Sequence, residues 1–183
     1  MKNLLVLVFL VSFPSIYCQT SNENNNKLSG ALGIGGYFSN YSNGLALNIG
    51  ANYLKNKNYW KLRLIWDYDI NNFNIWGIKP KEQYYDIGIL YGKLFNKKTY
   101  RAYISAGLGV LAGVKRGEFL YSSGLMGSSQ YEAEHIFAPT IPLEIGLSSI
   151  PKKNIGGIGI TGFVNLNIEN ILVGFIIKLE FGI

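Results

Sequence analysis

Strict alternation between apolar and polar residues is the feature of this sequence that most constrains its fold. Over residues 45–53 the odd-numbered positions hold Leu, Leu, Ile, Ala and Tyr, whereas Ala, Asn, Gly and Asn lie between them. Residues 60–68 repeat the pattern with the apolar side in the even-numbered positions. A period of two places successive side chains on opposite faces of a β-strand. Both segments are therefore predicted to be strands with one apolar and one polar face.

The same alternation recurs along the chain. Eight strands are predicted, over residues 28–38, 44–54, 59–69, 83–95, 99–114, 137–149, 156–167 and 170–182. Short, lysine-containing turns follow the second, fourth and sixth strands, and longer loops follow the third (70–82) and the fifth (115–136). Small outer-membrane barrels have this arrangement, with short turns at one end and long loops at the other. Because proline donates no backbone hydrogen bond, Pro139 and Pro142 predict a bulge, or a strand start near Ile141.

The two faces of the strands differ from those of a soluble protein. Glycine and other small residues make up most of the polar face, where a water-exposed strand would carry Lys, Glu and Thr. The apolar face is nearly pure, and aromatic residues gather toward the strand ends, as in the girdles at membrane interfaces. The sequence therefore predicts an all-β fold, an eight-stranded antiparallel up-and-down transmembrane barrel. A soluble, lipocalin-like carrier is the alternative fold with the same alternation.

The N-terminal residues 1–18 have the features of a secretory signal peptide, with Lys2 before an apolar run and Pro14 after it. Cys18 is the only cysteine, and two processing routes are open. A lipoprotein peptidase would cleave before Cys18 and leave it acylated, whereas ordinary cleavage after Cys18 removes it. The second route is favoured because Tyr17 is bulky where a lipoprotein signal has a small residue.

The rest of the chain is predicted to be one domain. Residues 19–27 are polar and rich in asparagine, which predicts a flexible periplasmic lead-in, and residues 28–183 form the barrel. An even number of strands places both termini on the periplasmic side. The formal net charge is +6, but the lysines gather in turns and the chain is exported, so we expect no nucleic-acid partner.

Charged residues also occur in the inward phase of the strands. Four positive and four negative residues are predicted to form a charge network in the lumen: Lys61, Arg63, Arg101, Lys178, Asp67, Asp86, Glu144 and Glu180. A buried charge is costly unless it is paired. We therefore expect a salt-bridged plug in which Glu144 pairs with Arg101, Arg63 or both. A selectivity or gating network is the alternative.

In these respects the chain resembles the small eight-stranded outer-membrane barrels of the OmpA-transmembrane, OmpX and OmpW kinds. The apolar and aromatic last segment, 175–183, is similar to the signal that the barrel assembly machinery reads, although Phe181 lies two residues from the end. Residues 142–146 are similar to a motif of outer membrane protein β-barrel domains. The resemblance implies the outer membrane of a Gram-negative-type cell, with outer-membrane lipid, lipopolysaccharide and the assembly machinery as partners.

An enzymatic role is not expected. Barrel enzymes that modify lipid A need a serine with a histidine base. The only histidine, His135, lies in a segment that also contains serines and glutamates, but the His-x-Ser pattern of lipid A deacylases is absent because Phe137 follows. A lipid A-modifying barrel that uses His135 is retained as the second alternative function. No cofactor is expected, and no metal site, because His135 would point away from Glu132 and Glu134 in an extended segment.

The two long loops are the candidate sites of function. Exposed aromatic and apolar residues on loops are typical of contact sites, and three alternatives are open here: the residues dock a partner protein, touch lipopolysaccharide, or simply fold over the barrel mouth. The candidates are Phe73, Trp76, Phe119, Tyr121, Met126 and Tyr131. The leading hypothesis is a non-enzymatic barrel that contributes to envelope integrity, or an interaction module that binds a protein partner through loops 70–82 and 115–136. A narrow channel for small solutes, as the OmpW resemblance implies, is the first alternative.

Overall fold

The structure is a computed structural model that describes residues 26–40, 42–55, 57–69, 80–96, 99–122, 129–149 and 157–182. The predicted signal peptide and most of the predicted lead-in lie outside these residues. Eight strands are present: β1 (Asn26–Phe38), β2 (Asn43–Lys55), β3 (Asn58–Asp69), β4 (Gln83–Asn96), β5 (Tyr100–Ser122), β6 (Ser129–Ser149), β7 (Gly157–Leu166) and β8 (Leu172–Phe181). Among the described residues, no helix is long and apolar enough to cross a membrane.

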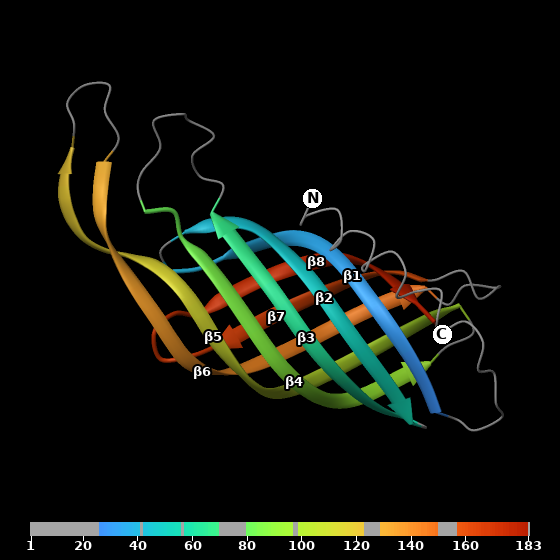
Figure 1. The fold of residues 1–183 in the computed structure, drawn as a ribbon. Helices are drawn as coiled ribbons and strands as arrows, with labels where there is room; N and C mark the ends of the chain where they lie inside the picture. The colour runs from blue at the N-terminus through green and yellow to red at the C-terminus, as the bar shows by residue number, and fades with distance from the viewer. Residues whose placement is uncertain are drawn as a thin grey trace, which may run out of the picture.

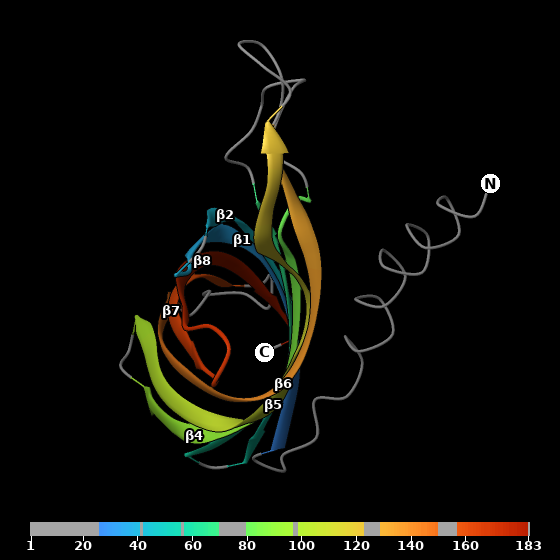
Figure 2. The same cartoon turned by 90° about the vertical axis from the view of Figure 1, so that its left-hand side faces the viewer.

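The strands form a closed, antiparallel ring in which each strand pairs with its neighbours in the sequence and β8 pairs with β1 (Figure 1). This confirms the predicted all-β, up-and-down barrel. Figure 2 shows the strands arranged around a common axis. β1 begins at Asn26, two residues before the predicted start of the barrel domain.

The register of the ring is slanted. Paired residues lead from Asn26 once round the barrel and back to β1 at Gly36, so one circuit advances the register by ten residues. Such a stagger requires the strands to tilt relative to the barrel axis. Side chains that lie far apart in the ladder can therefore meet across the lumen.

The alternation seen in the sequence decides which side chains face outward. In β2 the polar positions Asn48 and Asn52 are buried, whereas Leu47 and Ile49 are exposed on the outside of the ring. The same holds for β3 and β8, where Lys61 and Lys178 point inward. Apolar residues therefore cover the outside of the barrel. The polar residues point into its interior, which they share with two buried clusters of apolar and aromatic residues, one around Ile65 and Phe163 and one around Leu54 and Tyr59.

The predicted loop over residues 115–136 is wrong for most of its length. β5 continues to Ser122 and β6 already begins at Ser129, and the two remain paired as far as Ser122 and Ser129, with two register shifts after Arg116. Figure 1 shows this pair of strands projecting beyond the rest of the barrel. Phe119 and Tyr131 form a cross-strand pair whose rings lie 5.4 Å apart, edge to face. Such aromatic pairs stabilise a β-ladder, which extends the hairpin past the rim.

The prediction for the two prolines of β6, a bulge or a strand start near Ile141, is also wrong. The strand runs through Pro139 and Pro142 with its register against β5 unchanged, and the register shifts lie elsewhere, near Phe119. Instead, the ladder lacks its steps at Gly107 and Leu108, opposite Pro142 and Ile141. Proline has no backbone N–H to donate. The β5–β6 ladder is therefore interrupted locally, and the register is the same on both sides of the interruption.

The assignment of the outer and inner faces of the strands can be tested by substitutions on each face. Leu47→Arg or Ile177→Arg places a charge on the exposed apolar face, and in a lipid bilayer we expect each to cost about 2–4 kcal/mol of folding free energy near the midplane. Folding titrations into lipid vesicles measure this cost. Gly107→Leu is expected to block assembly by a different route, because a side chain there would strike the backbone of Ile89 and Leu90. Arginine variants that fold as well as the wild type would contradict the assignment of the outer face.

Candidate functional site

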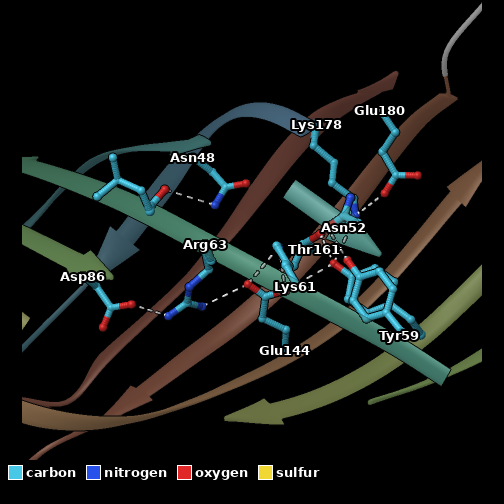
Figure 3. A network of polar contacts seen from close by, with 12 residues as sticks. Asn48, Asn52, Tyr59, Lys61, Arg63, Asp86, Glu144, Thr161, Lys178 and Glu180 are labelled. Carbon is cyan, nitrogen blue, oxygen red and sulfur yellow. Dashed lines mark hydrogen bonds and ion pairs between the residues drawn. The ribbon is translucent and has the colours of Figure 1, made fainter. Parts of the chain in front are cut away.

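The interior of the barrel holds all eight of the predicted lumen charges. Each has at most 8% of its surface exposed: Lys61, Arg63, Asp67, Asp86, Arg101, Glu144, Lys178 and Glu180. They come from β3, β4, β5, β6 and β8, and the strand parity points them all inward. Figure 3 shows most of them in one network of polar contacts.

Glu144 lies at the centre of this network. Its carboxylate accepts hydrogen bonds from Lys61 Nζ at 2.8 Å and from Arg63 Nη1 at 2.9 Å. The other end of the Arg63 guanidinium forms an ion pair with Asp86 and donates to Asn165 Oδ1 at 2.7 Å. Because these charges are fully buried, each depends on its partners to offset the loss of hydration.

A second group of contacts extends from Glu144 toward the end of the barrel at which the chain enters β5. Lys178 donates to the Tyr103 hydroxyl at 3.1 Å and forms an ion pair with Glu180. Arg101 lies 3.9 Å from Glu180. The hydroxyl of Tyr103 in turn lies 2.7 Å from Thr161 Oγ1 and 3.5 Å from Glu144. The polar contacts therefore run continuously through this half of the lumen.

The pairing of Glu144 differs in one respect from the prediction. Glu144 contacts Arg63, as expected, but its second partner is Lys61, and Arg101 pairs with Glu180 instead. The register explains the difference, because Arg101 is opposite Ser148 in β6, whereas Glu144 is opposite Ser105. Four residues of strand span roughly 13 Å, which places Arg101 beyond the reach of Glu144.

Asp67 departs from the predicted network. Its side chain is fully buried, yet neither carboxylate oxygen makes a hydrogen bond with any residue that the structure describes. Arg63 is the nearby cation of the same strand, but its two Nη atoms bond Glu144, Asp86 and Asn165 and not Asp67. The equal number of positive and negative residues therefore did not produce a pair for every charge.

Aromatic rings fill much of the remaining lumen by lying over glycines. The Tyr103 ring covers Gly146, and the Phe163 ring lies so close to Gly174 that a Cβ at that position would come within 2.5 Å of it. The Lys178 ammonium sits 4.4 Å from the centre of the Tyr103 ring. Small residues on one strand thus make room for large ones on another, as an eight-stranded barrel requires.

Sequence reasoning missed several neutral members of the network, including Tyr103, Thr140, Thr161 and Asn165. Their inward parity was visible in the alternation of β5, β6 and β7. However, parity alone does not indicate which inward hydroxyl or amide meets a charge, because that depends on the register all round the ring.

The rim from which the β5–β6 hairpin extends carries a separate set of ion pairs. Arg116 pairs with Asp69, and Lys115 Nζ lies 2.9 Å from Glu169 and 3.1 Å from Glu134. Lys115 lies beyond the last residue of β5 that pairs with β4, and its hydrogen bond to Glu169 raises the pKa of its ammonium group. These contacts tie the base of the hairpin to β3 and to the β7–β8 connection.

The predicted loop contacts fall into two groups. Phe119 and Tyr121 are more than half exposed on β5, and Tyr131 is partly buried on β6. They belong to the hairpin rather than to a loop. Phe73, Trp76 and Met126 lie outside the described residues.

The only histidine, His135, is exposed on β6 and opposite Val114, and no hydrogen bond or ion pair joins it to a serine or a carboxylate of the described ranges. Glu134 points to the other side and pairs with Lys115. Over the ranges that the structure describes, no three His, Cys, Asp or Glu side chains are grouped so that they could hold a metal ion.

Comparisons with known proteins identify the fold. No protein-family model matches the chain, and no curated protein matches its sequence. Among solved structures, Neisserial surface protein A (NspA) is similar over 87% of this chain and 97% of its own, with a TM-score of 0.59 and 12% identity. The N-terminal β-barrel domain of Pseudomonas aeruginosa OprF (85% and 98%, TM-score 0.52, 14% identity) and Ail, the attachment invasion locus protein of Yersinia pestis (85% and 99%, 0.54, 12%), are similar too. The chain therefore has the fold of the small eight-stranded outer-membrane barrels.

The network can be tested by a double-mutant cycle. Glu144→Gln alone is expected to destabilise the barrel by about 3–5 kcal/mol, because it leaves Lys61 and Arg63 buried without their shared partner. Adding Lys61→Met should then cost less than the sum of the two single changes. Urea titrations of folding in lipid vesicles measure these energies. Arg116→Met at the rim is the control and should add to Glu144→Gln within about 0.5 kcal/mol; additivity in the first pair would contradict the network.

Proposed function

We propose that the protein is a non-enzymatic barrel of the outer membrane, with a lumen closed by ion pairs and an interaction surface on its β5–β6 hairpin. The observation that carries this proposal is the burial of Lys61, Arg63 and Glu144, which join opposite walls of the barrel. A barrel of eight strands has little free bore once side chains fill it. The function of the protein is then an interaction at its surface rather than transport through its lumen.

The outside of the ring supports a place in a lipid bilayer. Large apolar residues are exposed on every strand, among them Leu62, Ile89, Ile145 and Ile177. A surface of this kind is soluble in hydrocarbon, and a closed ring leaves no unpaired strand edge there. The short turns would face the periplasm and the hairpin would face outward, as in other outer-membrane barrels. Signal cleavage and insertion by the assembly machinery belong to the same proposal.

The β5–β6 hairpin, residues 115–122 and 129–140, is the element best suited to contact a partner. Within the described residues, β5 has no β4 partner after Val114, and β6 has no β7 partner before Ile141. Each strand of the hairpin therefore has an edge outside the closed ring, and such edges bind extended segments of other proteins by adding a strand. Phe119, Leu120 and Tyr121 present apolar side chains on both faces of the same stretch.

Two of the similar structures carry names that refer to the cell surface or to attachment. A surface-exposed hairpin that binds a protein partner agrees with that kind of role. The exposed apolar residues near its tip distinguish this proposal from one in which the barrel contributes only to envelope integrity, because a purely structural barrel gains nothing from them.

A sealed lumen predicts an absence of conductance. The purified barrel in planar bilayers should show current near background, because the Glu144 network blocks the axis. Glu144→Gln should remain near background as well, since the Tyr103 and Phe163 rings still fill the lumen. A stable, well-defined open state in the wild type would instead favour the channel function.

The hairpin can be tested by cross-linking in growing cells. A photoreactive residue in place of Glu118 or Leu120, both exposed on the hairpin, should give discrete protein adducts. The matched control is Ile145 on β6, which is equally exposed but lies on the apolar outer face of the ring. Replacing residues 117–131 with a short turn should leave a barrel that still migrates differently when unheated in SDS. If the hairpin sites give no adducts beyond those of the control, the interaction module is wrong.

A further inference from the structure

The outer face of the barrel carries lysines at the end where the short turns lie. Lys55, the last residue of β2, is opposite Asn58 of β3, and Asn58 is opposite Lys93 of β4. All three side chains are exposed and share the outward parity of their strands. Adjacent strands lie about 4.8 Å apart, so the backbones of the two lysines are separated by roughly 10 Å. Lys55 and Lys93 therefore flank Asn58 in one row across three strands.

A third lysine is held next to this row by a backbone hydrogen bond. Lys57 is exposed in the turn between β2 and β3, and its carbonyl accepts from the Leu94 backbone N–H at 3.0 Å. The bond fixes the turn against β4 one residue after Lys93. A lysine side chain lays its methylene groups along an apolar surface and extends its ammonium group toward water. The ammonium groups of Lys55, Lys57 and Lys93, the lysine cluster, can therefore converge on one anion.

The lysine cluster has no counter-charge on the protein among the described residues. None of its three ammonium groups forms a hydrogen bond or an ion pair with a described residue. The described carboxylates are either buried or lie at the hairpin end: Asp67, Asp69, Glu82, Asp86, Glu144 and Glu180 are buried, and Glu118, Glu132, Glu134 and Glu169 are at the hairpin end. The described outer face at the turn end is therefore purely cationic.

Aromatic side chains lie directly beside the lysine cluster, on the side toward the middle of the barrel. Tyr53, Trp60 and Tyr91 are opposite one another in the next row of the outer face, and all three are exposed. The Trp60 and Tyr91 rings lie 4.7 Å apart. Tryptophan and tyrosine are enriched at the headgroup level of membranes because they join an apolar body to a polar end. In a bilayer, this aromatic row places the lysines at the level of the phosphates.

From this arrangement we infer that the lysine cluster binds the phosphate of an anionic phospholipid, while Trp60 and Tyr91 contact the first part of its acyl chains. Basic residues at a membrane surface attract anionic headgroups, and ammonium groups donate strong hydrogen bonds to phosphate oxygens. The side chain of Asn58 can donate to the same headgroup from between two of the lysines. The inference rests on the proposed place of the ring in a bilayer and not on a partner of the hairpin.

Quenching of tryptophan fluorescence by brominated lipids tests the site in vesicles that contain the full, folded chain. Trp66→Phe combined with Trp76→Phe leaves Trp60 as the reporter beside the lysine cluster. The probes are phosphatidylglycerol and phosphatidylcholine with identical brominated acyl chains, each mixed into unbrominated phosphatidylcholine. We expect phosphatidylglycerol to be preferred around Trp60 about fivefold or more, which corresponds to about 1 kcal/mol. Added salt should weaken the preference, because it screens exposed charges.

Substitutions of exposed lysines provide the matched comparison. Combining Lys55→Gln, Lys57→Gln and Lys93→Gln leaves the buried network unchanged and should bring the preference at Trp60 close to one. Lys93→Gln alone should give an intermediate value. Lys81→Gln removes an exposed lysine at the hairpin end of the barrel and should leave the preference at Trp60 unchanged. Migration in unheated SDS verifies that each variant has assembled.

Three results would overturn the inference. The reporter chain could be quenched equally by the two lipids, or the triple variant could keep the preference. Lys81→Gln could also lower the preference as much as Lys93→Gln does, which would show diffuse attraction instead of a site. A chain that does not enter the vesicles would contradict the place of the ring in a bilayer, and this inference with it. An inserted chain without a lipid preference contradicts this inference alone, so the two failures are distinguishable.

Discussion

Closure of the antiparallel ladder is the constraint on which the rest of this structure depends. A chain that crosses hydrocarbon with strands must pair every backbone N–H and C=O within itself, and only a closed ring does so. Here β8 returns to β1, and the register advances by ten residues per circuit. The strand number and this stagger together fix how wide the lumen is. Every side chain in the ring then belongs either to the apolar exterior or to a narrow interior.

The narrow interior explains why its charges are arranged as they are. Water cannot hydrate Arg63 or Glu144 at zero and 3% exposure, so each must find its partners among the other walls. The slant of the register brings Lys61 of β3 to Glu144 of β6, although more than 80 residues separate them in the sequence. One carboxylate shared by two cations makes this part of the lumen a single unit. The glycines opposite Tyr103 and Phe163 allow the rings to occupy the remaining space.

Where β5 and β6 extend beyond the ring, closure of the ladder is lost and strand edges are left unpaired. Beyond Val114 the strands of the hairpin pair only with each other among the described residues, and their outer edges are no longer closed. An open edge exposes unpaired backbone N–H and C=O groups, which are costly in hydrocarbon and which in water can pair with another chain. Rim ion pairs such as Arg116 with Asp69 hold the base of the hairpin, and the apolar side chains beyond them remain exposed.

The sequence by itself determined the class of fold, the number of strands and the face on which Leu47 or Lys61 lies, because a period of two residues is a local property that tertiary structure did not override. It did not determine that β5 continues beyond residue 114 or that β6 begins before residue 137. The glycines, serines and charged residues there are equally compatible with a loop until cross-strand pairs form. Nor could it assign Arg101 to Glu180 or leave Asp67 unpaired. Those outcomes depend on a register that accumulates strand by strand and is fixed only when the ring closes.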